Sequence, residues 1–247
     1  VLLAATAVSM DFWNVRVEDV LVGQESSSYR VNGEIPVIPL ESFSDEVASA
    51  MEDVSQKMEE QDLYLNSSPG YWLRTFDRWA DCEEFIGFPL NNPLEKSSLL
   101  ETANYFAIAQ DAETLNEESQ RHCAVALQGN IKGELQHVTI DTGYLMGPIR
   151  IQMTVSLYPE GSGMEPGTGG SWNGEAEFEI TSGVTGEGIP YTLVVSETPE
   201  SDYYNDFSSA DAYFVLKNGL YTLDAVSPGR DSGADAKAAL EELLALF

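Results

Sequence analysis

The sequence predicts an α+β fold: a mainly antiparallel sheet of about six to eight strands, covered by helices that include a C-terminal helix, with an N-terminal arm or subdomain. From residue 121 onward, apolar residues recur at every second position in short segments, as in half-buried strands. Around residues 44–61 and 232–247 they recur at helical spacing. Successive short strands form an antiparallel sheet, and its apolar face needs a covering layer.

Residues 1–65 are predicted to form the arm or subdomain. Alternating valines in 12–22 predict a strand, and the stretch 44–61 predicts a helix that begins after Ser44, a good capping residue. The apolar opening around Ala5-Thr6-Ala7 has two interpretations, the end of an export signal or a buried strand.

The loop sequence NSSPG at residues 66–70 marks the predicted boundary with a second domain, residues 71–247. In that domain we expect a helix at 97–109 and a loop at the glycine-rich stretch 159–171. Asn218-Gly219 between two apolar runs predicts a tight hairpin, and the leucine-rich stripe of 232–247 predicts the C-terminal helix.

The charge of the chain is its most unusual property. The 247 residues include 41 Asp and Glu against 12 Lys and Arg, a net charge of -29. Such a surface repels phosphate groups, so we expect no nucleic acid partner. Three interpretations of the charge stay open: a salty environment, an exported protein that faces a cationic or metal-rich surface, or an ordinary solvated surface rich in acids.

Cys82 and Cys123 are the only cysteines. An even, minimal count favours one disulfide in an oxidising compartment, which predicts an extracytoplasmic protein (secreted, periplasmic or cell-surface). In the chain-entropy model, closing a loop of roughly 40 residues stabilises the fold by about 4 kcal/mol. The alternative is two buried free thiols in a cytoplasmic protein. His122 and Cys123 would point to opposite faces of one strand, which argues against a shared metal or a Cys–His nucleophile.

Acidic side chains form two further candidate sites. Glu83, Glu84, Glu175 and Glu177 are the candidates for a hydrolase that cleaves polysaccharide or cell-wall material with paired carboxylates. The alternative for the acidic strand 175–179 is a solvated sheet face. Asp202, Asn205, Asp206 and Asp211 are weak candidates for Ca²⁺, without the spacing of a known calcium loop.

No catalytic motif, cofactor motif or long apolar span is recognisable in the sequence. We therefore expect a non-catalytic exported protein without a cofactor, which binds a protein partner or assembles into a larger structure. The candidate contact residues are Trp72, Trp79, Tyr203 and Tyr204, because Trp and Tyr anchor interfaces; the alternative is that the tryptophans belong to the core. The alternatives for function are the hydrolase and a Ca²⁺-stabilised surface or shell protein.

Overall fold

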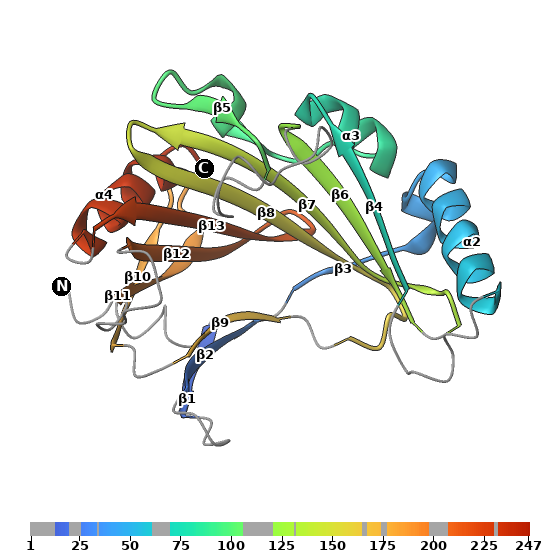
Figure 1. The fold of residues 1–247 in the computed structure, drawn as a ribbon, viewed down its shortest axis with the longest axis horizontal. Helices are drawn as coiled ribbons and strands as arrows, with labels where there is room; N and C mark the ends of the chain where they lie inside the picture. Colours follow the sequence, from blue (N-terminus) through green and yellow to red (C-terminus); the bar gives the residue numbers. More distant parts are fainter. Residues whose placement is uncertain are drawn as a thin grey trace.

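The computed structural model describes residues 13–19, 26–33, 35–60, 70–105, 121–130, 132–164, 167–173, 177–197, 207–229 and 232–247. Within these ranges the chain forms a large sheet of ten strands, a small sheet of three strands and three α-helices (Figure 1).

The strands of the large sheet are β3 (Val37–Ile38), β4 (Gly70–Phe76), β5 (Glu101–Ala103), β6 (Cys123–Gly129), β7 (Leu135–Met146), β8 (Ile149–Pro159), β10 (Glu177–Val184), β11 (Pro190–Glu197), β12 (Phe207–Leu216) and β13 (Gly219–Pro228). The small sheet contains β1 (Trp13–Asp19), β2 (Ser26–Gly33) and β9 (Gly167–Asn173). The helices are α2 (Asp45–Glu60), α3 (Trp79–Ile86) and α4 (Gly233–Leu244), with short 3-10 turns η1 (Leu40–Ser42) and η3 (Pro93–Lys96).

The large sheet runs in the order β10-β11-β12-β13-β8-β7-β6-β4, and all neighbours on this path are antiparallel. In addition, β5 pairs with β7, and β3 pairs with β8 in the parallel sense. The predicted antiparallel sheet and C-terminal helix are therefore confirmed, but the sheet is larger than predicted. Strands as short as β3 and β5 carry no alternation that a sequence pattern can reveal.

Two local predictions were wrong. The helix expected at 97–109 is instead an extended segment at 101–103, where β5 pairs with Gly143–Leu145 of β7; residues 106–109 lie outside the described ranges. Part of the glycine-rich stretch expected to be a loop forms β9, which pairs with β2. Strand pairing uses only backbone groups, so glycine and serine join a sheet without any apolar pattern.

The main core lies between one face of the large sheet and the helices α3 and α4, which cover it (Figure 1). Alternation decides which residues enter it: Ile140, Met153 and Leu223 point into the core from neighbouring strands. We call this side of the large sheet the helix-covered face. Phe214 packs there against Tyr221 and Phe247, with ring centroids 5.4 and 4.9 Å away.

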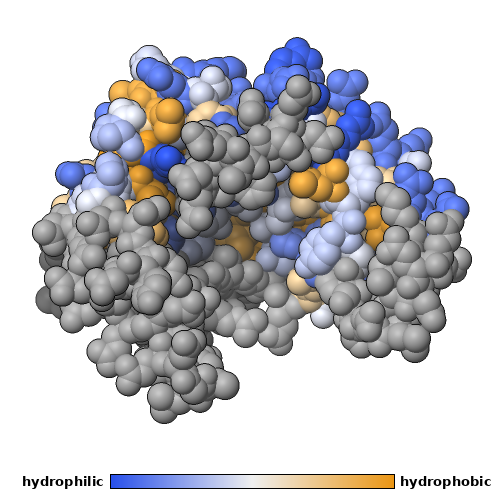
Figure 2. Space-filling model, viewed as in Figure 1, coloured by the Kyte–Doolittle hydropathy of each residue, from blue (hydrophilic) through white to orange (hydrophobic). Residues whose placement is uncertain are grey.

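Helix α2 packs into the same core, because Val47, Met51 and Val54 join the cluster formed by the sheet. Its beginning agrees with the capping prediction, since the backbone N–H of Val47 donates to Ser44 Oγ at 3.2 Å. The outer surface of α2 is hydrophilic (Figure 2). Helix 44–61 therefore shares its core with the large sheet.

The predicted hairpin joins β12 to β13, one residue earlier than the sequence suggested. Lys217 and Asn218 form the turn, while Gly219 already pairs with Leu216. Lys217 takes the positive φ of 54°. A Cβ on Gly219 would lie 2.9 Å from Val155 Cγ1, so close packing explains the glycine.

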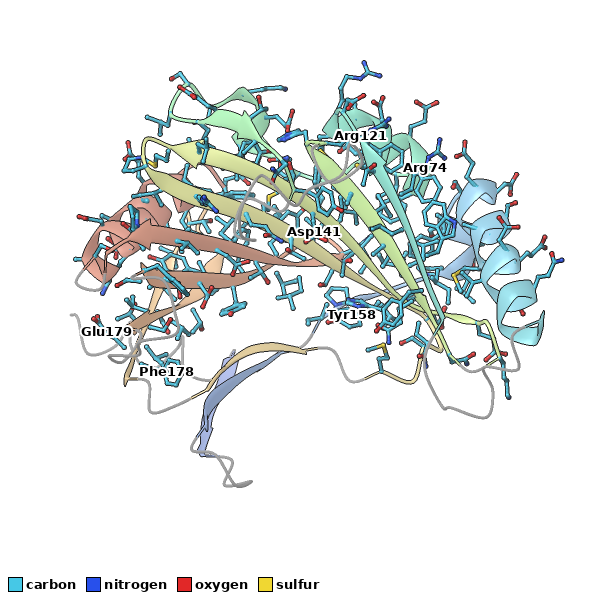
Figure 3. The ribbon with its side chains drawn as sticks, in the orientation of Figure 1. Arg74, Arg121, Asp141, Tyr158, Phe178 and Glu179 are labelled. Atoms are coloured by element: carbon cyan, nitrogen blue, oxygen red, sulfur yellow. The ribbon has the colours of Figure 1, made fainter. Side chains whose placement is uncertain are left out.

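The opposite side of the large sheet, which we call the second face, carries a smaller apolar cluster. Its buried members are Ile35, Tyr158, Val194, Tyr213 and Leu220. Polar residues alternate with the core residues along the same strands and share this side; among them is Asp141 in the middle of the sheet (Figure 3). One face is therefore almost wholly apolar, and the other is mixed.

Candidate functional site: a buried cysteine–histidine–glutamate cluster

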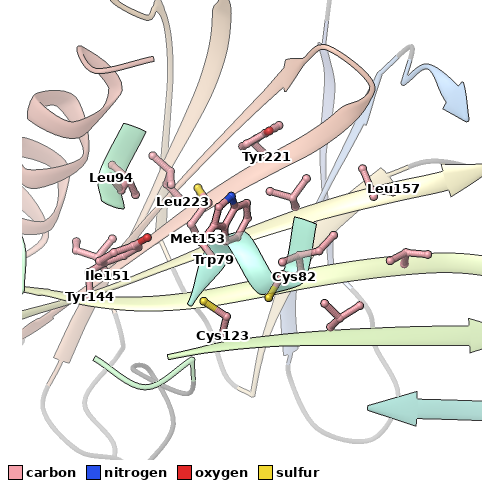
Figure 4. Packing of buried hydrophobic residues seen from close by; sticks show 14 of the residues in the cluster. Trp79, Cys82, Leu94, Cys123, Tyr144, Ile151, Met153, Leu157, Tyr221 and Leu223 are labelled. Carbon is pink, nitrogen blue, oxygen red and sulfur yellow. The ribbon is translucent and has the colours of Figure 1, made fainter. Parts of the chain in front are cut away.

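The two cysteines meet in the core, 4.3 Å apart (Figure 4). Cys82 comes from α3 and Cys123 from the first position of β6, and both are fully buried. The predicted disulfide is not formed in the structure, where both thiols are free. A disulfide requires the sulfurs to approach to about 2 Å, so bond formation needs a further small movement of the side chains.

A hydrogen-bonded network extends from Cys123 to the surface. The Cys123 thiol lies 3.5 Å from Thr142 Oγ1, which is 3.1 Å from His122 Nε2. His122 Nε2 is also 2.7 Å from Glu95 Oε1. Tyr144 donates its hydroxyl to the same Glu95 oxygen at 2.8 Å. Segments distant in the sequence (η3, β6 and β7) thus share one polar cluster beside the core.

The geometry of His122 indicates that its ring is protonated on both nitrogens. Nδ1 lies 2.8 Å from the carbonyl oxygen of Ala103, and Nε2 faces the carboxylate of Glu95. Both of these partners only accept hydrogen bonds, so each ring nitrogen must donate. Burial opposes the charge, but hydrogen bonds to Cys123, Glu95 and Ala103 outweigh it and raise the pKa of His122 to about 10.

The same cluster makes the two thiols unequal. A hydrogen bond from Cys82, together with His122 and Thr142, lowers the pKa of Cys123 against the effect of burial. The hydrogen bond to Cys123 and burial raise the pKa of Cys82. The two pKa values therefore shift in opposite directions, and ionisation of the pair is favoured at Cys123 rather than at Cys82.

Sequence reasoning missed this cluster because it placed His122 and Cys123 on opposite faces of one strand. In the structure β6 begins only at Cys123, so strand alternation does not govern His122. Both side chains approach Thr142. Glu95 and Tyr144 carried no signal of their own, since one lies in a short turn and the other in an alternating strand.

Of the four aromatic residues proposed as contacts, the structure describes the two tryptophans. Trp79 is buried in the core, and Trp72 is partly buried and stacks on Phe85 with ring centroids 5.1 Å apart. The structure thus places both tryptophans against the core, the alternative that the sequence left open. Tyr203 and Tyr204 lie outside the described residues.

The predicted carboxylate sites are not assembled among the described residues. Glu83 Oε1 accepts hydrogen bonds from Trp79 Nε1 at 3.1 Å and from the backbone N–H of Leu90 at 2.7 Å, so it holds the end of α3 in place. Glu84 is exposed; Glu175 lies outside the described ranges, and Glu177 begins β10.

Of the Ca²⁺ candidates, only Asp211 is described, on β12; Asp202, Asn205 and Asp206 lie outside the described residues. Within the part of the chain that the structure describes, no three His, Cys, Asp or Glu side chains are arranged to hold a metal ion. Nor does any helix there combine the length and apolar character needed to cross a membrane.

Comparison with known proteins adds no relative. No family model, curated protein or solved structure matches the chain.

Proposed function

We propose that the protein is a non-catalytic exported protein that binds a basic protein partner along strand β4, and that Cys82 and Cys123 join as a disulfide in its oxidising compartment. The observation that carries the binding proposal is the exposure of two large apolar side chains on an edge strand. Tyr71 is 67% exposed and Leu73 is 55% exposed, both on β4. Neighbouring exposed apolar side chains are typical of contact surfaces.

Strand β4 ends the large sheet, and within the described residues it pairs only with β6. An edge strand presents unpaired backbone N–H and C=O groups to which an extended segment of another protein can add. Trp72 and Phe76 anchor β4 by packing against Phe85 of α3. A strand that is anchored to α3 and exposes two apolar side chains is a suitable template for strand addition.

The expected partner is basic because the surroundings of β4 are acidic. Helix α2 packs beside β4 and exposes Glu46, Glu52 and Asp53. Glu46 forms an exposed ion pair with Arg74 of β4, 3.3 Å between Nη1 and Oε2. The whole chain has a net charge of -29. Complementary charge accelerates association and excludes acidic partners.

Support for export comes from the cysteines. Cys82 and Cys123 are 41 residues apart in the sequence (123 minus 82), but the fold brings them to 4.3 Å. Disulfide formation removes two protons and two electrons, which a disulfide-bearing oxidant takes up as it is reduced to two thiols. The bond would tie α3 to β6.

The binding proposal is tested by cross-linking in the native compartment, followed by mass spectrometry. We expect a stoichiometric partner with cross-links at residues 70–76, lost in the Tyr71→Ser/Leu73→Ser double variant. Val184→Ser is the matched control, because Val184 is 65% exposed on the opposite edge strand, β10. A lone monomer, or a partner retained by the double variant, contradicts binding at β4.

The export proposal has a separate readout on the same material. Alkylation of free thiols before lysis, followed by peptide mass spectrometry, should find Cys82 linked to Cys123. Two alkylated cysteines would contradict an oxidising compartment, whatever the partner experiment shows.

A further inference from the structure

Ionisable side chains form a row across the second face of the large sheet. Asp211 of β12 and Asp224 of β13 are direct partners in the antiparallel register. Asp224 in turn pairs with Gln152 of β8, and Asp141 of β7 lies opposite Thr154 of β8. Three aspartates from three strands thus occupy one side of four adjacent strands.

The three carboxyl groups have different surroundings. Asp141 accepts hydrogen bonds from the Thr154 hydroxyl at 2.5 Å and from Gln152 Nε2 at 3.2 Å. Asp224 makes its side-chain hydrogen bond to Asp211, another carboxyl group. Directly opposite residues in an antiparallel pair have Cβ atoms about 4.5–5.5 Å apart. Asp211 and Asp224 are therefore held together by the register itself.

The charged groups around Asp224 do not offset the repulsion between Asp211 and Asp224. Asp211 faces it from β12, and Asp141 adds negative charge from β7. From β8, the nearest basic residue in the register is Arg150, diagonal to Asp224, opposite Val226 and exposed to solvent. On β13 itself the flanking residues on this face are Thr222 and Val226.

Two carboxylates in contact cannot both ionise without strong repulsion, so such pairs retain one proton well above the usual aspartate range. A carboxyl–carboxyl hydrogen bond also needs one proton, because a carboxylate has none to donate. Consistent with this, burial, and then the charge and hydrogen bond of Asp211, raise the pKa of Asp224 well above its ordinary value.

We infer that Asp211 and Asp224 form a proton-binding site, in which the two carboxyl groups share one proton in the folded protein at neutral pH. The unfolded chain, with both groups in water, releases that proton. Folding is then coupled to proton uptake at this site, and acidification favours the fold.

The direction of the pH dependence follows from the coupling between proton binding and folding. Because the pKa of Asp224 is higher in the folded than in the unfolded chain, its stabilising contribution is complete below the ordinary aspartate pKa of 3.8. It is lost as the pH rises from there to the raised pKa of the folded protein. Within this window the unfolding equilibrium constant increases by up to about tenfold per pH unit for this one proton.

The test is denaturant unfolding from pH 4 to pH 9 for the wild type and Asp224→Asn. Asparagine keeps the hydrogen bond to Asp211 without needing the proton. We expect the wild-type unfolding constant, divided by that of Asp224→Asn, to rise with pH by at least tenfold in total. Asp53→Asn is the control, because Asp53 is exposed on α2. The wild-type unfolding constant divided by that of Asp53→Asn should not change with pH. A flat ratio for Asp224→Asn would overturn the inference.

Infrared spectroscopy provides an independent test if Asp224→Asn does not fold. At pH 7 the wild-type infrared spectrum should contain the C=O stretching band of a protonated carboxylic acid, which shifts with isotopic labelling of aspartate. Asp211→Asn should weaken the band, because it removes the second carboxyl group of the pair, and Asp53→Asn should leave it unchanged. Absence of the band from the folded wild type would also overturn the shared proton.

Discussion

Beside the core on the helix-covered face, Glu95, His122 and Tyr144 form a network in which donors meet acceptors. On the second face, by contrast, the register places the carboxyl groups of Asp211 and Asp224 opposite each other. The two described histidines show the same contrast. Both ring nitrogens of His122 have partners, and its pKa is raised to about 10. His137 stacks on Tyr158 at 4.8 Å, its Nε2 has no hydrogen-bond partner among the described residues, and burial lowers its pKa to about 4. Hydrogen-bond partners, more than the depth of burial, therefore decide whether these histidines retain a charge.

The largest effect that tests this contrast is expected in the apolar part of the helix-covered face. Phe214→Ala removes a fully buried ring that packs against Tyr221 and Phe247. We expect a loss of about 3–5 kcal/mol in the free energy of unfolding, measured with denaturant. Tyr71→Ala, at an exposed site on the second face, should change it by less than about 0.5 kcal/mol. Equal losses would show that the buried ring of Phe214 stabilises the fold no more than the exposed ring of Tyr71.

A smaller effect is expected from Glu95→Gln, which leaves the His122 imidazolium without its carboxylate. Because the Glu95 side chain is 28% exposed, the loss should lie in the lower half of the range of about 1–3 kcal/mol for an unpaired buried polar group. Glu101→Gln, on the exposed side of β5, is the control.

The pH dependence of Glu95→Gln tests whether Glu95 stabilises the charge of His122. The raised pKa of His122 gives the wild type a contribution that is complete below the ordinary pKa of 6.5 and is lost as the pH rises through about 10. In Glu95→Gln the pKa of His122 should fall, so that this contribution to stability is lost at a lower pH than in the wild type. Unfolding measured from pH 6 to pH 10, with NMR titration of His122, checks this. An unchanged titration would mean that Glu95 does not stabilise the charge.

Near pH 8 the smallest effect is expected at His137. Its lowered pKa implies a contribution that is complete above pH 6.5 and is lost as the pH falls through about 4, because the unfolded chain binds the proton more readily. His137→Phe keeps an aromatic ring against Tyr158 and removes that proton. Near pH 8 the free energy of unfolding should change by less than about 1 kcal/mol, whereas at pH 4 the variant should be more stable than the wild type. A variant that loses stability in acid as steeply as the wild type would contradict this.

Some of the architecture could be predicted because it depends on local pattern. Alternation over residues 149–158 identifies β8 and the residues that it buries, and Ser44 marks where α2 begins. The strands β3, β5 and β9 could not be predicted, because they are short or rich in glycine and exist only through backbone pairing with distant strands.

The candidate cluster was predictable only in part. Spacing and count directed attention to Cys82 and Cys123, and the structure brings them to 4.3 Å. Nothing local indicated that Glu95 would reach His122 across 27 residues of chain. The exposed pair Tyr71 and Leu73 was also missed, since a sequence does not show which strand ends a sheet.

The sequence by itself determined the acidic surface, the alternating strands, the C-terminal helix and the presence of two cysteines, because composition and short-range periodicity fix these properties. The tertiary structure decided which strands are neighbours and in which register. That choice places Asp211 opposite Asp224 and Cys123 opposite Thr142. Register depends on how the whole apolar face packs against its helices, and a slip of one residue would reverse the face of every side chain. The shared chemistry of these residues is therefore a property of the assembled sheet.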